Sequence, residues 1–317
     1  MKSDGQSIRD AYSEILLELG SQHPELVVLD ADGARTHRTE RFGQAYPERF
    51  FDLGIAEQNT VAVAAGLASC GKVPVATMFA NFAALRALEQ IKTLVSYPRL
   101  NVKIVGGYAG VSDGPDGPTH HCLMDLAAIR ALPNMVVLAP SDTSSVRVAM
   151  AAALSHRGPM YIRLVYGTFG TYHRADCDLR VGRGAILAEG QDVTILVSGP
   201  VLDAVMLARG LLQKSGVAAR VVDLFSVKPL DETLILQSAI ETGALVTVEE
   251  HSVIGGIGEG IASLVSAHIP VPVERLGYPD RHLESASYSA LMDRYGPSAA
   301  AIVKGVERVM ARKRGTY

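Results

Sequence analysis

Short apolar runs, each the length of a β-strand, alternate with longer helical segments through most of this sequence. In the first half, strands are expected at residues 26–29, 74–78, 102–105, 136–138 and 161–165, and helices at 8–19, 60–69 and 84–95. Regular alternation of strand and helix predicts a parallel sheet with helices on both of its faces. The expected fold class is therefore α/β, with a doubly wound, mostly parallel sheet.

The pattern stops near the middle of the chain and then starts again. Residues 167–184 lose periodicity and gain Gly, His and charged residues, which predicts a linker. Beyond it, strands are expected at 193–197, 219–224 and 244–248, and helices at 202–214, 232–241 and 258–268. The 317 residues suffice for two domains. We predict a first domain over residues 1–175 and a smaller α/β domain over 185–317.

The composition excludes some classes of protein. A formal net charge of −3 and the lack of any long Lys/Arg run argue against nucleic-acid binding. Three cysteines, Cys70, Cys122 and Cys177, are far apart and lack metal-ligand spacing, which is typical of a reducing compartment. Neither a leader sequence nor a run long enough to span a membrane is evident. We expect a soluble, cytoplasmic protein that does not bind membranes.

One carboxylate, Glu57, lies where an extended run turns into an Ala- and Val-rich helix. Gly54, three residues earlier, allows the backbone to turn tightly. Open α/β sheets usually bind their ligands at such strand-to-helix edges. The plain alternative is an acid that the helix dipole favours in a first turn, and spacing alone leaves both interpretations open.

Three blocks add specificity because they occur in a fixed order. They are Gly54–Gln58, Thr77–Phe82 and Asp116–His121, the last of which continues to Leu132–Met135 and Ala139–Asp142. With these blocks the chain resembles the transketolase family, including the related 1-deoxyxylulose-5-phosphate synthases. The resemblance begins near Ser7 and covers nearly the whole chain, as a pyrimidine-binding domain followed by a transketolase C-terminal domain.

The resemblance implies thiamine diphosphate as the cofactor. Glu57 matches the glutamate that binds the aminopyrimidine ring and takes part in catalysis, and Asp32 also falls among the cofactor-binding positions. Phe79 and Phe82 match aromatic residues that stack on the pyrimidine, and Phe82 matches the stacking position most closely. The alternative is that both are core residues. The family has a further aromatic residue where this chain has Leu85, so the pocket departs from the family's pattern there.

The resemblance also implies a set of residues that contact substrate. Asp116 and His120 match groups that bind sugar hydroxyls, and His120 also has a catalytic role, since histidine exchanges protons near neutral pH. Arg163 matches an arginine that grips the substrate phosphate, and Thr36 lies near another expected phosphate contact. The alternatives are a solvated loop for Asp116 and His120, and a surface ion pair for Arg163. No metal site is expected on this chain, because His120 and the adjacent His121 would point apart and no third ligand is spaced nearby.

The family's diphosphate-binding signature, Gly-Asp-Gly, does not occur in the sequence. The resemblance therefore implies the C-terminal subunit of a split transketolase, with no region upstream to hold that missing domain. A separate N-terminal subunit would bind the diphosphate and carry the Mg²⁺ ligands, in an α2β2 assembly. The expected reaction transfers a two-carbon ketol unit from a ketose phosphate to an aldose, so the substrates are sugar phosphates.

Other readings remain open at this point. Within thiamine-diphosphate enzymes, the alternatives are a 1-deoxyxylulose-5-phosphate synthase-like activity or the β-subunit of a 2-oxo acid dehydrogenase. Residues 110–114 fit the G-x-S-x-G motif of serine hydrolases, but the prolines that follow prevent the required helix. Residues 255–260 miss the G-x-G-x-x-G spacing of a dinucleotide site. A non-catalytic assembly protein is a further alternative, although Glu57, Phe82 and His120 together argue against it.

Overall fold

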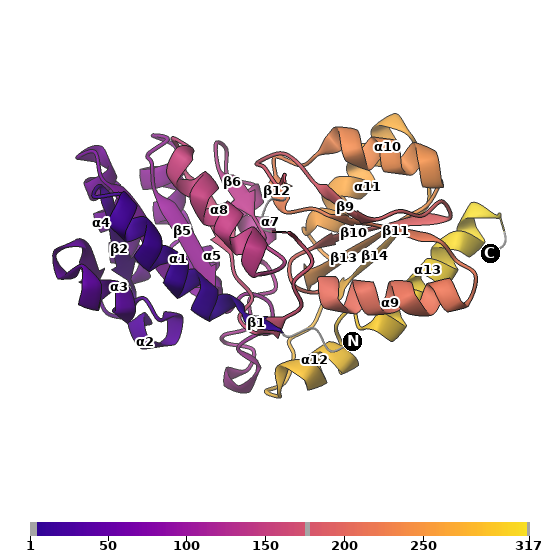
Figure 1. Cartoon of the computed structure of the whole chain (residues 1–317), viewed down its shortest axis with the longest axis horizontal. Coiled ribbons are helices and arrows are strands. Elements are labelled where there is room, and N and C mark those ends of the chain that lie inside the picture. Colours follow the sequence, from indigo (N-terminus) through magenta and orange to yellow (C-terminus); the bar gives the residue numbers. More distant parts are fainter. Residues whose placement is uncertain (1–4, 175–177, 316–317) are drawn as a thin grey trace.

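A computed structural model describes residues 5–174 and 178–315 of the chain. The two halves of the sequence form two lobes that lie side by side (Figure 1). Cys177 and the predicted domain limits at residues 1, 175 and 317 lie outside the described residues.

The first lobe is built around a seven-stranded sheet of order β12-β6-β7-β5-β4-β2-β3, in which β12 alone runs antiparallel. Its strands are β2 (Leu26–Asp30), β3 (Phe50–Asp52), β4 (Val73–Phe79), β5 (Lys103–Gly107), β6 (Val136–Leu138), β7 (Met160–Arg163) and β12 (Ser226–Lys228). Strands β2, β5 and β7 are buried at every residue, as expected for parallel strands covered on both faces.

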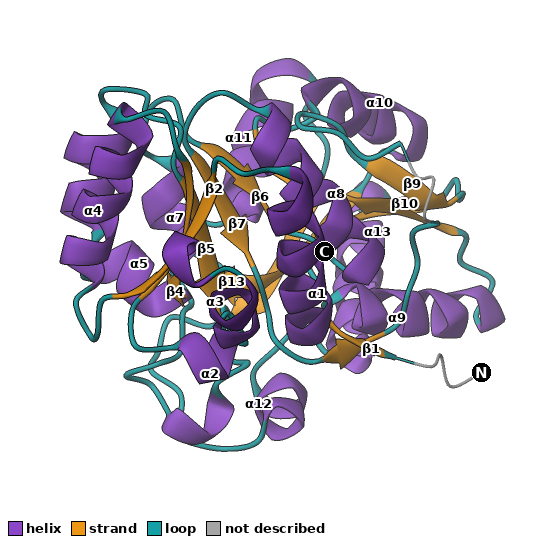
Figure 2. Ribbon diagram, turned by 60° about the vertical axis from the view of Figure 1, so that its left-hand side comes forward, coloured by secondary structure: helices purple, strands orange, loops and turns teal. Residues whose placement is uncertain are grey.

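Helices cover both faces of this sheet, as Figure 2 shows. They are α1 (Ile8–Gln22), α2 (Ala34–His37), α3 (Glu40–Ala45), α4 (Glu57–Ser69), α5 (Ala80–Leu85), α6 (Leu88–Gln90), α7 (Asp125–Arg130) and α8 (Thr143–Ser155). Apolar residues of α4 and α7 pack in one core cluster, and those of α1 and α8 pack in another. The sheet is therefore doubly wound.

The second lobe has a five-stranded sheet of order β14-β13-β10-β11-β9, parallel except for β9. Its strands are β9 (Ala185–Ala188), β10 (Val193–Ser198), β11 (Ala219–Asp223), β13 (Leu245–Ser252) and β14 (Val273–Tyr278). Its helices are α9 (Leu202–Lys214), α10 (Glu232–Thr242), α11 (Ile257–His268), α12 (Tyr288–Arg294) and α13 (Ala299–Lys313). A short antiparallel pair, β1 (Gln6–Ser7) and β8 (Thr168–Phe169), lies below the junction of the lobes (Figure 1).

The two lobes share a strand. Although β12 comes from the second half of the sequence, it pairs with β6 at the edge of the first sheet, with Ser226 opposite Leu138. The first sheet is thus completed by residues that lie far beyond the linker.

The predicted fold class is confirmed, but one predicted helix is wrong in detail. In place of a continuous helix over 84–95, the chain forms α5, breaks at Arg86 and Ala87, and continues through α6 into a π-helical turn, Ile91–Ser96. Ala87, at this break, is fully buried. Within the described residues, none of the helices combines the length and the apolar character that a membrane span requires.

Candidate active site at the carboxyl edge of the first sheet

Most of the predicted site residues follow the carboxyl ends of adjacent parallel strands. Asp32 and Thr36 come after β2, Glu57 after β3, and Phe79 ends β4. This is the edge where open α/β sheets bind ligands.

Glu57 is the first residue of α4, and its side chain is 2% exposed. The backbone reaches it through Gly54, whose φ of +71° is a conformation that glycine adopts without strain. The Asp52 carboxylate accepts hydrogen bonds from the backbone N–H groups of Gly54 and Asp32, both at 3.1 Å. The turn that carries Glu57 is thereby tied to the exposed Asp32 at the end of the neighbouring strand.

Arg86 is the direct partner of Glu57. Its Nη1 atom donates a hydrogen bond to Glu57 Oε2 at 2.7 Å, and its guanidinium carbon lies 4.3 Å from the centre of the Phe82 ring. One side chain therefore joins the predicted catalytic carboxylate to the predicted stacking residue.

Aromatic rings continue the site from Phe82 along the sheet edge. Phe79 lies 5.8 Å from Phe82 and stacks on Tyr108 at 5.3 Å, with an interplanar angle of 17°. The His120 ring meets Phe79 and Phe82 nearly edge-on, at 5.8 Å and 5.3 Å. Both phenylalanines remain partly exposed, so they are not simply core residues.

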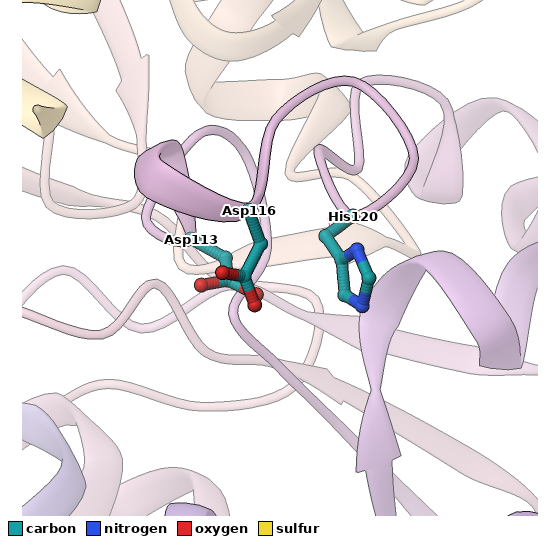
Figure 3. Close-up of side chains that lie close together, drawn as sticks. All are labelled: Asp113, Asp116 and His120. Carbon is teal, nitrogen blue, oxygen red and sulfur yellow. The ribbon is translucent and has the colours of Figure 1, made fainter. Parts of the chain in front are cut away.

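His120 has two carboxyl neighbours. One carboxylate oxygen each of Asp113 and Asp116 and one ring nitrogen of His120 all lie within 4.8 Å of one another. Figure 3 shows the two carboxyl groups side by side. Burial, together with the charge of Asp116, raises the pKa of Asp113 to about 6. The expectation that no third ligand-type group would lie near His120 was therefore wrong. The loop folds back on itself in a 3₁₀ turn at Gly114–Asp116 and brings the three side chains together.

Arg9 supplies a cation at the Thr36 end of the site. Its Nη1 atom donates to Tyr108 Oη at 3.3 Å and to the Thr36 carbonyl at 3.5 Å. The side chain is partly exposed, so its guanidinium remains within reach of a ligand. Sequence reasoning missed Arg9 because 27 residues separate it from Thr36 and no local motif connects them.

Behind Tyr108 the site is closed by two buried side chains. His37 Nδ1 lies 3.1 Å from Tyr166 Oη, and burial and the charge of Arg9 lower the pKa of His37 to about 3. His37 is therefore neutral at physiological pH, and it supports the rings of Tyr108 and Tyr166 rather than carrying charge.

The position of Arg163 corrects the expectation of a phosphate contact. Its side chain is 2% exposed, Nε donates to Asp125 Oδ2 at 2.9 Å, and Nη2 donates to the Glu250 carbonyl at 2.7 Å. The guanidinium is engaged inside the chain, between the two lobes. It is a buried ion pair, so the alternative of a surface ion pair does not describe it either.

The two competing motifs have structural explanations. Ser112 donates to the Ala109 carbonyl at 2.8 Å and is followed by the 3₁₀ turn instead of the helix that a serine hydrolase needs. At the start of α11, the backbone N–H groups of Ile257 and Gly258 already donate to the Glu249 carboxylate. That helix end is satisfied within the chain.

The site lies beside, and not inside, a cavity of about 800 Å³ between the lobes. Leu85 and Met124 line this cavity from the first lobe, and Ile254 and Leu283 from the second. Glu57, the phenylalanines and His120 are not among its lining residues.

Comparison with known proteins agrees with this architecture. Residues 4–168 match the family described as "Transketolase, pyrimidine binding domain", and residues 182–302 match "Transketolase, C-terminal domain". The chain is 37% identical to a 6-deoxy-6-sulfo-D-fructose transketolase subunit of Clostridium sp., over 99% of this chain and 97% of the relative. It is 34% identical to an apulose-4-phosphate transketolase subunit of Phocaeicola vulgatus, over 93% of this chain and 95% of that relative.

A solved structure gives the same result at the level of the fold. A split-gene transketolase, described as an inactive beta4 tetramer, superposes with a TM-score of 0.91 at 44% identity, over 98% of this chain and all of that one. The chain also resembles longer 1-deoxy-D-xylulose-5-phosphate synthases over about half of their length. The chain therefore belongs to the transketolase family, as a transketolase-type transferase that matches the separately encoded subunits of that family over nearly its whole length.

Proposed function

We propose that this chain is the C-terminal subunit of a thiamine-diphosphate-dependent transketolase, which transfers a two-carbon ketol unit from a ketose phosphate to an aldose. The observation that carries the proposal is the buried Glu57 carboxylate at the start of α4, joined through Arg86 to the Phe82 ring.

The side chains at this edge fit the pyrimidine half of the cofactor. A planar, N–H-bearing ring needs an acceptor for its nitrogen-bound protons and an apolar face to stack on, and Glu57 and Phe82 offer these two features. A planar guanidinium, that of Arg86, already makes both contacts in this structure. When bound, thiamine diphosphate supplies a carbon nucleophile that adds to the carbonyl group of a sugar.

The chain's own residues would have distinct tasks. Glu57 would hold the proton that is exchanged with the pyrimidine ring. Phe79 and Phe82 would hold that ring in place, and Asp32 would contact the cofactor where it enters the site. Because α4 begins at Glu57 and the Asp52 hydrogen bonds hold the preceding turn, the carboxylate is oriented before any ligand binds.

Asp116 and His120 would bind the sugar hydroxyls. His120 would also exchange protons with the substrate, since histidine is a common general acid and base, and the carboxyl groups of Asp113 and Asp116 lie beside it. Arg9, together with Thr36, would receive the anionic end of the substrate, since a guanidinium pairs well with phosphate or sulfonate oxygens. This assignment replaces Arg163, which is buried.

The diphosphate and Mg²⁺ would be held by a separate N-terminal subunit in an α2β2 assembly. Two observations support this arrangement: the sequence lacks Gly-Asp-Gly, and a related split-gene chain is inactive as a beta4 tetramer. The Asp116–His120 block favours a sugar-transferring enzyme over a 2-oxo acid dehydrogenase subunit.

The proposal is tested by purifying the chain from its own host with thiamine diphosphate and Mg²⁺ present. Native mass spectrometry should recover a second subunit and bound cofactor. The complex should then transfer two carbons from a ketose phosphate, or from 6-deoxy-6-sulfo-D-fructose, to an aldose. Glu57→Gln should lower kcat by at least about 100-fold, because that is the usual minimum for loss of a proton-transfer group.

The Glu57→Gln complex must keep the subunit composition of the wild type, which the same mass spectrum checks. Turnover near the wild-type rate in this variant would remove Glu57 from the mechanism. A chain that assembles only with itself and binds no cofactor would contradict the proposed function as a whole.

A further inference from the structure

The proposed function assigns no task to Arg86, yet the Arg86 side chain contacts both Glu57 and Phe82. The side chain leaves the main chain at the break between α5 and α6, four residues after Phe82. From there it passes over the Phe82 ring and reaches Glu57 at the head of α4.

These contacts coincide with the two that the proposed function assigns to the aminopyrimidine. The guanidinium is planar, its Nη1 atom donates to Glu57 Oε2 at 2.7 Å, and its carbon lies 4.3 Å from the Phe82 ring centre. Stacked rings have their centres about 4.5–7 Å apart, so a guanidinium over a ring face takes the space of a stacked ring.

The other neighbours of Phe82 do not offer such a contact. Phe79 and His120 meet the ring at interplanar angles of 55° and 75°, so neither lies flat against it. Arg86 covers one face of the Phe82 ring, and the same guanidinium reaches Glu57. A pyrimidine ring that contacts Glu57 cannot stack on that face while the guanidinium occupies it.

Arg86 is free to leave this position. Its side chain is 41% exposed, so it can swing into water without burying a charge. Among the described residues, Glu57 is the only acceptor for a hydrogen bond from its guanidinium. Glu57, by contrast, is 2% exposed and keeps its place at the start of α4.

We propose that Arg86 is an internal competitor of the cofactor. Its guanidinium occupies the place of the aminopyrimidine on Glu57 and Phe82, and it must be displaced before the pyrimidine can bind. The inference rests on the proposed function, since it takes Glu57 and Phe82 as the pyrimidine site. As a consequence, the chain itself blocks the pyrimidine site. Contacts with the rest of the cofactor must supply enough binding free energy to offset the loss of the Arg86 contacts.

The test is the affinity of the assembled complex for thiamine diphosphate, measured by titration calorimetry with Mg²⁺ at saturation. Arg86→Ala should lower Kd by about 3- to 30-fold, which is the combined strength of an ion pair whose cation is exposed and a cation–π contact. Guanidinium chloride at millimolar concentration should weaken cofactor binding to this variant more than the same concentration of NaCl does. It should have little effect on the wild type, which already carries its own guanidinium.

Two further variants separate charge from shape. Arg86→Gln keeps a planar N–H group without the charge, and its Kd should lie between those of wild type and Arg86→Ala. Arg147→Ala is the control: Arg147 is an exposed arginine paired with Glu18 on the surface, and its loss should leave Kd unchanged.

The outcomes distinguish the two proposals. A wild-type complex that binds no cofactor refutes the proposed function and this inference with it. If the wild type binds but Arg86→Ala binds equally well or more weakly, the inference alone is overturned, and Arg86 is then a neutral or supporting residue. An unfolded Arg86→Ala chain would be recognised by thermal melting, and the Arg86→Gln titration would then decide.

Discussion

Arg9 and Arg163 have the same charge but different surroundings, and these decide what each can bind. Arg163 is buried and donates to Asp125 and to a carbonyl of the other lobe. Arg9 is partly exposed and makes two long hydrogen bonds, to Tyr108 and to the Thr36 carbonyl. A weakly held guanidinium at the surface can exchange these partners for a ligand anion, whereas a buried one cannot do so without leaving a carboxylate unpaired.

We predict that Arg9→Met raises the KM for a ketose with an anionic end by about 10-fold or more, because a charged hydrogen bond contributes about 1.5–3 kcal/mol. The value of kcat should change much less, since the proposed proton transfer is assigned to Glu57 and His120 and not to Arg9. Steady-state kinetics of the assembled enzyme give both constants.

A ketose without an anionic end is the matched control substrate, and its KM should not change in Arg9→Met. Equal changes for both substrates would mean that Arg9 supports the fold of the site and does not bind the anion.

At the scale of single residues, the sequence predicted several side chains of the site, and the fold showed which residues they contact. Phe82 and Arg86 are four residues apart, the spacing of side-chain neighbours on a helix, so their contact was accessible to sequence reasoning. The contact of Arg86 with Glu57 was not, because it joins the first residue of α4 to the break after α5, and β4 lies between them in the sequence. Asp113 lies near His120 only because of the 3₁₀ turn between them.

At the scale of elements, one buried ion pair holds β7, α7 and β13 together. Asp125 is the first residue of α7, and it accepts hydrogen bonds from Arg163 Nε at 2.9 Å and from Tyr161 Oη at 2.8 Å. Arg163 also donates to the Glu250 carbonyl on β13. The carboxyl end of β7 is thereby attached to both lobes.

Arg163→Met should therefore destabilise the chain by about 3–5 kcal/mol, because it leaves the Asp125 carboxylate buried without its cation. The double variant Arg163→Met/Asp125→Leu should recover part of this loss, since an apolar pair needs no charge balance. Chemical denaturation of the three proteins measures both effects.

The opposite pattern would restore the phosphate role of Arg163. In that case Arg163→Met would have the same free energy of unfolding as the wild type, and its KM for a phosphorylated ketose would increase.

At the scale of the whole molecule, a buried cluster joins the linker to both lobes. His173 Nδ1 lies 3.1 Å from Asp142 Oδ2, at the N-cap of α8, and His173 Nε2 lies 3.3 Å from Asp223 Oδ2, at the end of β11. Burial alone would lower the pKa of His173, but Asp142 and Asp223 raise it above its ordinary value. Burial raises the pKa of Asp223 to about 7 despite the opposing effect of His173.

This cluster predicts a pH dependence of the free energy of unfolding. Because the pKa of His173 is higher in the folded chain, protonated His173 stabilises the fold fully below pH 6.5, its ordinary pKa. That contribution is lost as the pH rises through the folded pKa. His173→Gln should lower the melting temperature at pH 6 and flatten the decline in stability above about pH 6.5.

Thermal unfolding at a series of pH values checks this, and His268→Gln is the control, because His268 is exposed near the end of α11. An unchanged slope in His173→Gln would mean that other groups govern the pH dependence.

By itself, the sequence determined the α/β class, the first sheet's parallel strands and the position of Glu57, because these depend on short-range periodicity and on the turn at Gly54. It also determined the family, through blocks of residues that occur in order. Only the tertiary structure decided which arginine is buried, which reaches the site and which lies on Glu57. Burial and pairing depend on contacts between segments that are distant along the chain, and local patterns carry no information about them.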